Sequence, residues 1–124
     1  MAYSMRRLPD AELEVMQALW ACDGPATRAQ LEQRLQATHP MATTTLLTLL
    51  TRLKDKNFIT VEPVGRSRVY APNVTQEDYL AAQSKSFFHK LCGGNLSVFA
   101  SALCDSGLSK EELQELRKLL EEGE

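Results

Sequence analysis

The sequence predicts a mainly α-helical chain, in which a winged helix-turn-helix domain with a small β-hairpin wing precedes a C-terminal helical lobe. Three short amphipathic segments separated by turn signals predict the first three helices. Two β-prone segments on either side of Gly65 predict the hairpin. Further helical segments follow, so we expect domains at residues 1–73 and 74–124. The same order of elements also fits a generic α+β domain that enters no groove.

The first two helices are predicted from their start and stop signals. Asp10 is expected to cap the first helix, and the DGP sequence at 23–25 ends it. Thr27 and Gln30 have the spacing of a capping box, which predicts the start of the second helix. The THP sequence at 38–40 is the next break.

The third helix is expected over about residues 42–56, and its two faces differ. Four leucines share one face and are expected to be buried: Leu46, Leu49, Leu50 and Leu53. The far side carries threonines, with Leu47 at its edge: Thr44, Thr48 and Thr51. Threonine is a mediocre helix former, but its hydroxyl can reach a phosphate or base edge and its methyl can pack on thymine. The alternative is the neutral polar face of an ordinary helix.

Cations on the hairpin and near the third helix favour contact with double-stranded DNA. Arg66 and Arg68 are two residues apart, so both are predicted to project from one side of a strand and to suit phosphate contact. Three more cations lie near the third helix: Arg52, Lys54 and Lys56. Solvated surface charge is the alternative interpretation.

The C-terminal lobe is predicted to form a dimer interface. Thr75 is expected to cap a helix that the GGN sequence at 93–95 ends, and Ser109 and Glu112 form a capping box for the last helix. The lobe carries more apolar side chains than so small a unit buries alone, so a second copy is expected to cover them. The predicted interface residues are Tyr79, Leu80, Phe87, Phe88, Leu91, Leu96, Phe99, Leu103, Leu113, Leu116 and Leu120.

Charge is distributed unevenly along the 124 residues, whose net charge is −2. Residues 1–73 hold nine Lys/Arg against seven Asp/Glu, whereas residues 74–124 hold five against nine. This asymmetry suits a protein that touches an anion with its first lobe. No apolar run is long enough to span a membrane and no signal peptide is visible, so we expect a cytoplasmic protein.

The sequence carries no catalytic motif. It has no Gly-rich phosphate loop, H-E-x-x-H or nucleophile motif, so no enzyme and no cofactor are predicted. Its three cysteines, Cys22, Cys92 and Cys104, are too few and too irregular for a disulfide framework. His89, Cys92 and Cys104 could hold Zn²⁺ or Cu(I), but a surface histidine and buried thiols are the expected interpretation, and no metal is predicted.

Five segments, in order and nearly end to end, carry a family resemblance. The first helix of the family is matched by AELEVMQALW. Its recognition helix and the exit from that helix are matched by TTLLTLLTRL followed by KDKNFI, and its wing is matched by GRSRVYAP. VTQEDYLAAQSKSFFHKLCGGN and LSKEELQELRKLL match a dimerisation lobe. Together they resemble the penicillinase repressor family, the BlaI/MecI/CopY group. Asn57 stands where that family usually has Gly, and Asn tolerates the left-handed conformation.

The resemblance implies a homodimeric transcriptional repressor that binds a palindromic operator and is released when the dimer or its DNA-binding geometry is disrupted. With positions carried over from the family, the predicted DNA-contacting residues are Thr43, Thr44, Thr45, Leu47, Thr48, Thr51, Arg52, Lys56, Arg66 and Arg68. A regulatory protease is a further implied partner. However, Ser101 and Ala102 stand where the cleaved repressors carry an Asn-Phe pair, and the tail lacks the Cys-x-Cys of the copper branch. A winged-helix protein-interaction module and a metal- or thiol-responsive variant of the repressor are the alternatives.

Overall fold

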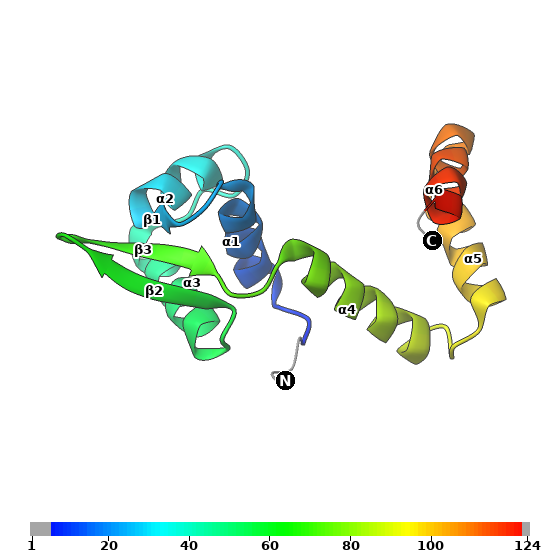
Figure 1. Ribbon diagram of the computed structural model, residues 1–124, viewed down its shortest axis with the longest axis horizontal. Coiled ribbons are helices and arrows are strands. Elements are labelled where there is room, and N and C mark those ends of the chain that lie inside the picture. The colour runs from blue at the N-terminus through cyan, green and yellow to red at the C-terminus, as the bar shows by residue number, and fades with distance from the viewer. Residues whose placement is uncertain (1–5, 123–124) are drawn as a thin grey trace. The chain divides into compact units, whose positions relative to one another are not determined.

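The computed structural model describes residues 6–122 and divides the chain into two compact units, one up to Gln83 and one from Ser84. The predicted mainly α-helical fold with a small antiparallel sheet is confirmed (Figure 1). In chain order the elements are α1 (Asp10–Ala21), β1 (Ala26–Thr27), α2 (Arg28–Gln36), α3 (Thr43–Asp55), β2 (Ile59–Val64), β3 (Ser67–Pro72), α4 (Gln76–Lys90), α5 (Leu96–Asp105) and α6 (Lys110–Glu122).

The helix starts follow the local sequence signals with one correction. Thr27 and Gln30 form the predicted capping box: the Thr27 N–H donates to Gln30 Oε1 at 2.8 Å, and the Gln30 N–H donates to Thr27 Oγ1 at 3.3 Å. The predicted cap of α1 is wrong by one residue, because Pro9 is the N-cap. Asp10 is the first helical residue, and its exposed carboxylate lies 3.5 Å from Arg7.

The sheet contains one more strand than the sequence predicts. Its order is β1-β3-β2, with every pairing antiparallel. The hairpin pairs Val64 with Ser67, and Gly65 has a φ of 62° in the two-residue turn between them. A positive φ at the first turn residue is what a type II′ hairpin requires, so glycine fits there. The unpredicted strand is β1, whose Ala26 pairs with Tyr70 of β3.

The core of the N-terminal unit lies between α1, α2, α3 and the sheet. The leucine face of α3 is buried as predicted, with Leu46 and Leu53 completely covered. Phe58, directly after α3, and Ile59, at the start of β2, continue this core. The core therefore takes up one face of α3 and leaves the other uncovered.

The first turns of α4 belong to the N-terminal unit, which corrects two expectations. Tyr79 is 2% exposed, its ring lies 5.9 Å from that of Phe58, and its hydroxyl accepts a hydrogen bond from the Leu8 N–H at 2.8 Å. Tyr79 is therefore a core residue and not part of an open dimer face. The compact units meet ten residues beyond the predicted boundary, because Val74 and Tyr79 pack into the winged-helix core.

The C-terminal unit holds the rest of α4 together with α5 and α6. The predicted capping box of α6 is present, since the Ser109 N–H donates to Glu112 Oε1 and the Glu112 N–H donates to Ser109 Oγ. Phe99 packs against Phe87 and Phe88, with ring centroids 5.9 Å and 5.5 Å away. Neither α5 nor α6 contains a buried residue. Within residues 6–122, no helix has both the length and the apolar character that a membrane span needs.

Candidate DNA-binding surface

The face of α3 opposite its leucines is open to solvent. Thr44 and Thr48 are exposed, and Leu47 beside them is 41% exposed. The other predicted contact residues of this helix are exposed as well: Thr43, Thr45, Thr51 and Arg52. Among the described residues of the N-terminal unit, no other element buries these side chains, so α3 is open to solvent along this side.

Two threonine hydroxyls on this face donate to the helix itself. Thr48 Oγ1 donates to the Thr44 carbonyl at 3.0 Å, and Thr51 Oγ1 donates to the Leu47 carbonyl at 3.0 Å. A hydroxyl has one proton, so in this rotamer only its acceptor lone pairs and the methyl group face outward. A phosphate oxygen accepts and cannot donate, whereas adenine and cytosine amino groups donate and thymine offers a methyl. The resting geometry of Thr48 and Thr51 thus matches base edges better than phosphates.

All four predicted cations are exposed, but only Lys56 forms an ion pair within the described chain. Arg52, Arg66 and Arg68 are exposed, and none forms an ion pair with another residue of the described chain. Lys56 instead lies against Glu12, with Nζ 2.5 Å from Oε1. Arg66 lies in the hairpin turn and only Arg68 lies in β3, so the expectation that both project from one side of a strand is wrong.

Sequence reasoning missed two residues of α2, Arg28 and Glu32, that hold the start of α3. Glu32 of α2 accepts a hydrogen bond from Thr43 Oγ1 at 2.5 Å and forms an ion pair with Arg28 at 2.8 Å. The hydrogen bond from Thr43 lowers the pKa of Glu32; partial burial opposes this effect and Arg28 adds to it. These contacts tie the first residue of α3 to α2. A Thr and a Glu eleven residues apart give no local signal of such a contact.

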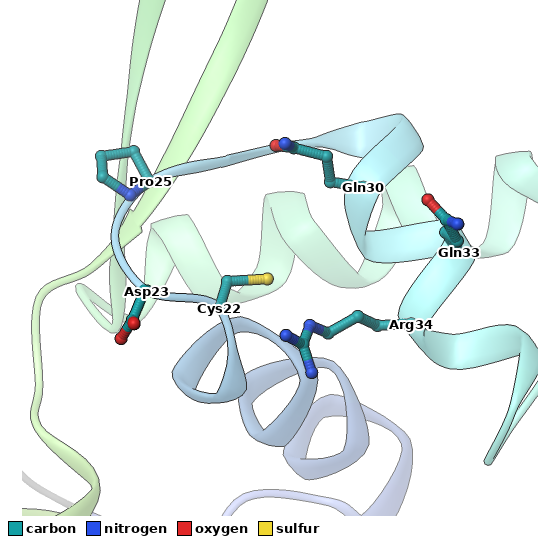
Figure 2. A pocket seen from close by; sticks show the side chains of 6 residues that line it. All are labelled: Cys22, Asp23, Pro25, Gln30, Gln33 and Arg34. Carbon is teal, nitrogen blue, oxygen red and sulfur yellow. The ribbon is translucent and has the colours of Figure 1, made fainter.

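A pocket of about 450 Å³ lies at the end of α1 and along α2 (Figure 2). Its lining residues are Cys22, Asp23, Pro25, Gln30, Gln33 and Arg34. All but Cys22 are exposed side chains, so this is an open, polar depression. None of them belongs to the predicted DNA-contacting set, which lies on α3, its C-terminal cap and the hairpin.

The cysteines and histidines do not assemble a metal site. Among the residues that the structure describes, no three His, Cys, Asp or Glu side chains come together as metal ligands. Cys92 is buried, Cys104 is exposed and Cys22 is half-buried, all as free thiols. The prediction that Cys104 is buried is therefore wrong.

The predicted dimer residues, apart from Tyr79, are exposed or half-buried. Leu91 and Leu96 are more than two-thirds exposed, as is Leu120 of α6. Leu80 and Phe87 are exposed to a lesser degree. The half-buried members of the set are Phe88, Phe99, Leu103, Leu113 and Leu116. Val98 and Leu119 are exposed apolar side chains that the prediction did not include.

Sequence comparison finds named regulatory proteins among the relatives of this chain. A penicillinase repressor of Bacillus licheniformis is 35% identical over 122 residues, which cover 95% of this chain and 94% of the relative. The methicillin resistance regulatory protein MecI of Staphylococcus aureus is 30% identical over 114 residues, covering 91% and 92% of the two chains. Both relatives are named as regulators and not as enzymes, in agreement with the sequence prediction.

Two solved structures match somewhat less than two thirds of the chain. The monomeric form of Bacillus licheniformis BlaI, solved in complex with the blaP half-operator, has a TM-score of 0.52 at 32% identity; the match covers 61% of this chain and 92% of that one. The DNA-binding domain of the repressor BlaI has a TM-score of 0.54 at 31% identity, with 63% and 94% covered. The family model described as penicillinase repressor matches residues 8–122. The chain therefore belongs to the penicillinase repressor family.

Proposed function

We propose that this chain is a sequence-specific transcriptional repressor that binds a palindromic DNA operator as a homodimer. The observation that carries the proposal is the open threonine face of α3, next to arginines that have no partner within the described chain. A relative at 32% identity is described in complex with half of an operator. In this arrangement α3 enters the major groove, and Arg66 and Arg68 contact phosphates. An operator-bound protein of this kind acts in the cytoplasm.

The apolar residues of the C-terminal unit support the homodimer. Leu120 is 69% exposed and Leu91 is 73% exposed, on a unit whose last two helices bury no residue. Fully burying one such leucine stabilises by roughly 1.5–3 kcal/mol, so several leucines covered at once favour association strongly. A second copy of the same chain is a self-complementary partner for this surface.

Dimer formation couples directly to operator binding. Two half-sites about one helical turn apart, roughly 34–36 Å, need two recognition helices held at a matching separation. The first domain to bind raises the effective concentration of the second at its half-site. Loss of the dimer therefore releases the operator, which gives a simple route to derepression.

The experiment tests DNA binding and the dimer separately. The operator is first selected from a pool of random duplexes with the full-length protein, and affinity is then measured from 50 to 200 mM salt. A steep fall with salt is expected from counterion release, whereas a protein-interaction module would select no duplex. If no duplex is enriched, the repressor assignment is wrong.

The dimer is tested by placing a charge on its predicted surface. Leu120→Asp is expected to give monomers in analytical ultracentrifugation and to weaken binding to the full operator far more than binding to a half-site. Gln114→Asp adds the same charge at an exposed polar position of α6 and is the matched control. A Leu120→Asp protein that remains dimeric would remove this surface from the interface.

A further inference from the structure

One carboxylate is buried in the N-terminal unit, and it holds the end of α3. Glu12, in the first turn of α1, is 2% exposed and is the only charged or polar residue in the buried class among those described. Its Oε1 lies 2.5 Å from Nζ of Lys56, a residue 44 positions later in the chain. Burial of a carboxylate is costly unless it is paired and hydrogen-bonded, so this contact offsets the cost of burying Glu12.

Lys56 occupies the C-cap of α3, where the helix leaves the DNA-binding surface. Its backbone N–H bonds to the Arg52 carbonyl, and the next residue, Asn57, has a φ of 66°. The carbonyl of Asn57 accepts a hydrogen bond from the Asn73 side chain at 3.0 Å. The end of α3 is thus fixed to α1 through Lys56 and to the residues after β3 through Asn57.

Polar contacts restrict a helix differently from apolar ones. The leucine face holds α3 against the core, but apolar contacts have little directional preference and tolerate small shifts along the helix axis. A charge-assisted hydrogen bond with a buried acceptor is satisfied only over a narrow range of distance and angle. A small slide of α3 that its leucine face tolerates would lengthen or misalign the Lys56–Glu12 contact.

We propose that Glu12 and Lys56 are positioning residues for operator recognition, and that Lys56 does not contact DNA phosphate. The pair sets the position and rotation of α3, and through them the direction in which Thr48 and Arg52 point. This inference rests on the proposed function, since it assumes that α3 reads the operator. It gives Lys56 a different role from the phosphate contact that the sequence suggests.

The test compares variants that remove either partner. Lys56→Met is expected to lower operator affinity at least tenfold while the slope of log affinity against log salt stays unchanged. A lost phosphate contact would instead flatten that slope by about 0.9 per protomer. Glu12→Gln retains the Lys56 charge and is expected to lower affinity to the same extent. The double variant should lose no more than either single variant, because both changes break one contact.

Two controls make each outcome decisive. Lys54→Met removes the same charge from an exposed position in the last turn of α3, and Lys54 forms no ion pair in the described chain. Any affinity that this variant loses should come with a flatter salt slope. Circular dichroism establishes that each variant is folded at the assay temperature. If Lys56→Met does not fold, Glu12→Asp, which keeps the charge but withdraws it by one methylene, serves as the variant.

The possible failures are distinguishable. A wild-type chain that selects no duplex overturns the proposed function itself. A wild-type chain that binds its operator, combined with a Glu12→Gln variant whose affinity is within twofold of it, overturns only the positioning role. A flatter salt slope for Lys56→Met would identify Lys56 as a phosphate contact.

Discussion

The hairpin turn offers a direct test of phosphate contact through Arg66→Ala. Arg66 is exposed, lies in the turn between β2 and β3, and forms no ion pair with the part of the chain that the structure describes. Its removal leaves no buried group unpaired, and a surface substitution of this kind usually changes stability by less than about 0.5 kcal/mol. Any loss of DNA affinity can then be assigned to the contact itself.

The size of the effect follows from counterion release. Each phosphate neutralised contributes about 0.9 to the slope of log affinity against log salt, so the loss of one contact in each protomer flattens the slope of the dimer by about 1.8. Over a fourfold rise in salt, from 50 to 200 mM, this changes the ratio between wild-type and variant affinities by about 12-fold. The variant is expected to bind all duplexes more weakly, with the largest deficit at low salt.

The assay is fluorescence anisotropy on the selected operator and on a random duplex of the same length, at several salt concentrations. Lys110→Ala is the control, since it removes an exposed cation from the C-terminal unit. Equal losses on both duplexes, together with the flatter slope, are the expected result. An Arg66→Ala protein with wild-type affinity and slope would remove the hairpin turn from the DNA-binding surface.

Three further changes probe α3 and the core. Thr48→Ala is expected to alter preference at one base position by about 1–3 kcal/mol in a binding selection, with little change in average affinity; a uniform loss over all sequences would indicate a phosphate contact. Tyr79→Phe leaves the Leu8 N–H without its buried acceptor, and should reduce the free energy of unfolding in urea by about 1–3 kcal/mol. Glu32 has a lowered pKa, so its contribution to stability is complete above about pH 4.5 and is lost as the pH falls through the folded-state value. Between pH 6 and 3 the melting temperature should therefore fall further for the wild type than for Glu32→Gln.

Local signals in the sequence predicted most of the fold. The capping residues Thr27 and Ser109 lie where their spacing placed them, because a cap depends on only three or four consecutive residues. Asn57 adopts the left-handed conformation expected of the residue that ends α3. The burial of the leucine face also follows from helical periodicity alone.

The features that were missed depend on residues far apart in the chain. β1 is two residues long and exists only through its pairing with β3, so no strand pattern marks it. The boundary between the units was predicted at residue 73, just before the helix that Thr75 was expected to cap, and Tyr79 was assigned to the second unit with the rest of that helix. Only its contacts with Trp20 and Phe58 show that it belongs to the first unit.

The cations of the DNA-binding surface show the same limit. Arg52 and Lys56 are four residues apart, and both are reasonable phosphate contacts on sequence grounds. Their surroundings differ in the structure, because Lys56 forms an ion pair with Glu12 whereas Arg52 is exposed and forms none in the described chain. A sequence pattern gives the number of charges on a helix, whereas their availability to a ligand depends on the neighbouring elements.

The threonines of α3 are tolerated because the opposite face provides far more stabilisation than they remove. Three threonines in place of the best helix formers cost at most roughly 2 kcal/mol, whereas burial of the four leucines contributes roughly 6–12 kcal/mol. Local helix propensity therefore contributes little to the stability of α3. The residues on its outer face can be those that suit the ligand and need not be the best helix formers. Lysines or glutamates there would help the isolated helix, but they would hold the backbone away from a groove floor or repel phosphates. Short side chains whose hydroxyl protons are directed back into the helix let the backbone approach closely, and they present methyl groups and acceptors to the base edges.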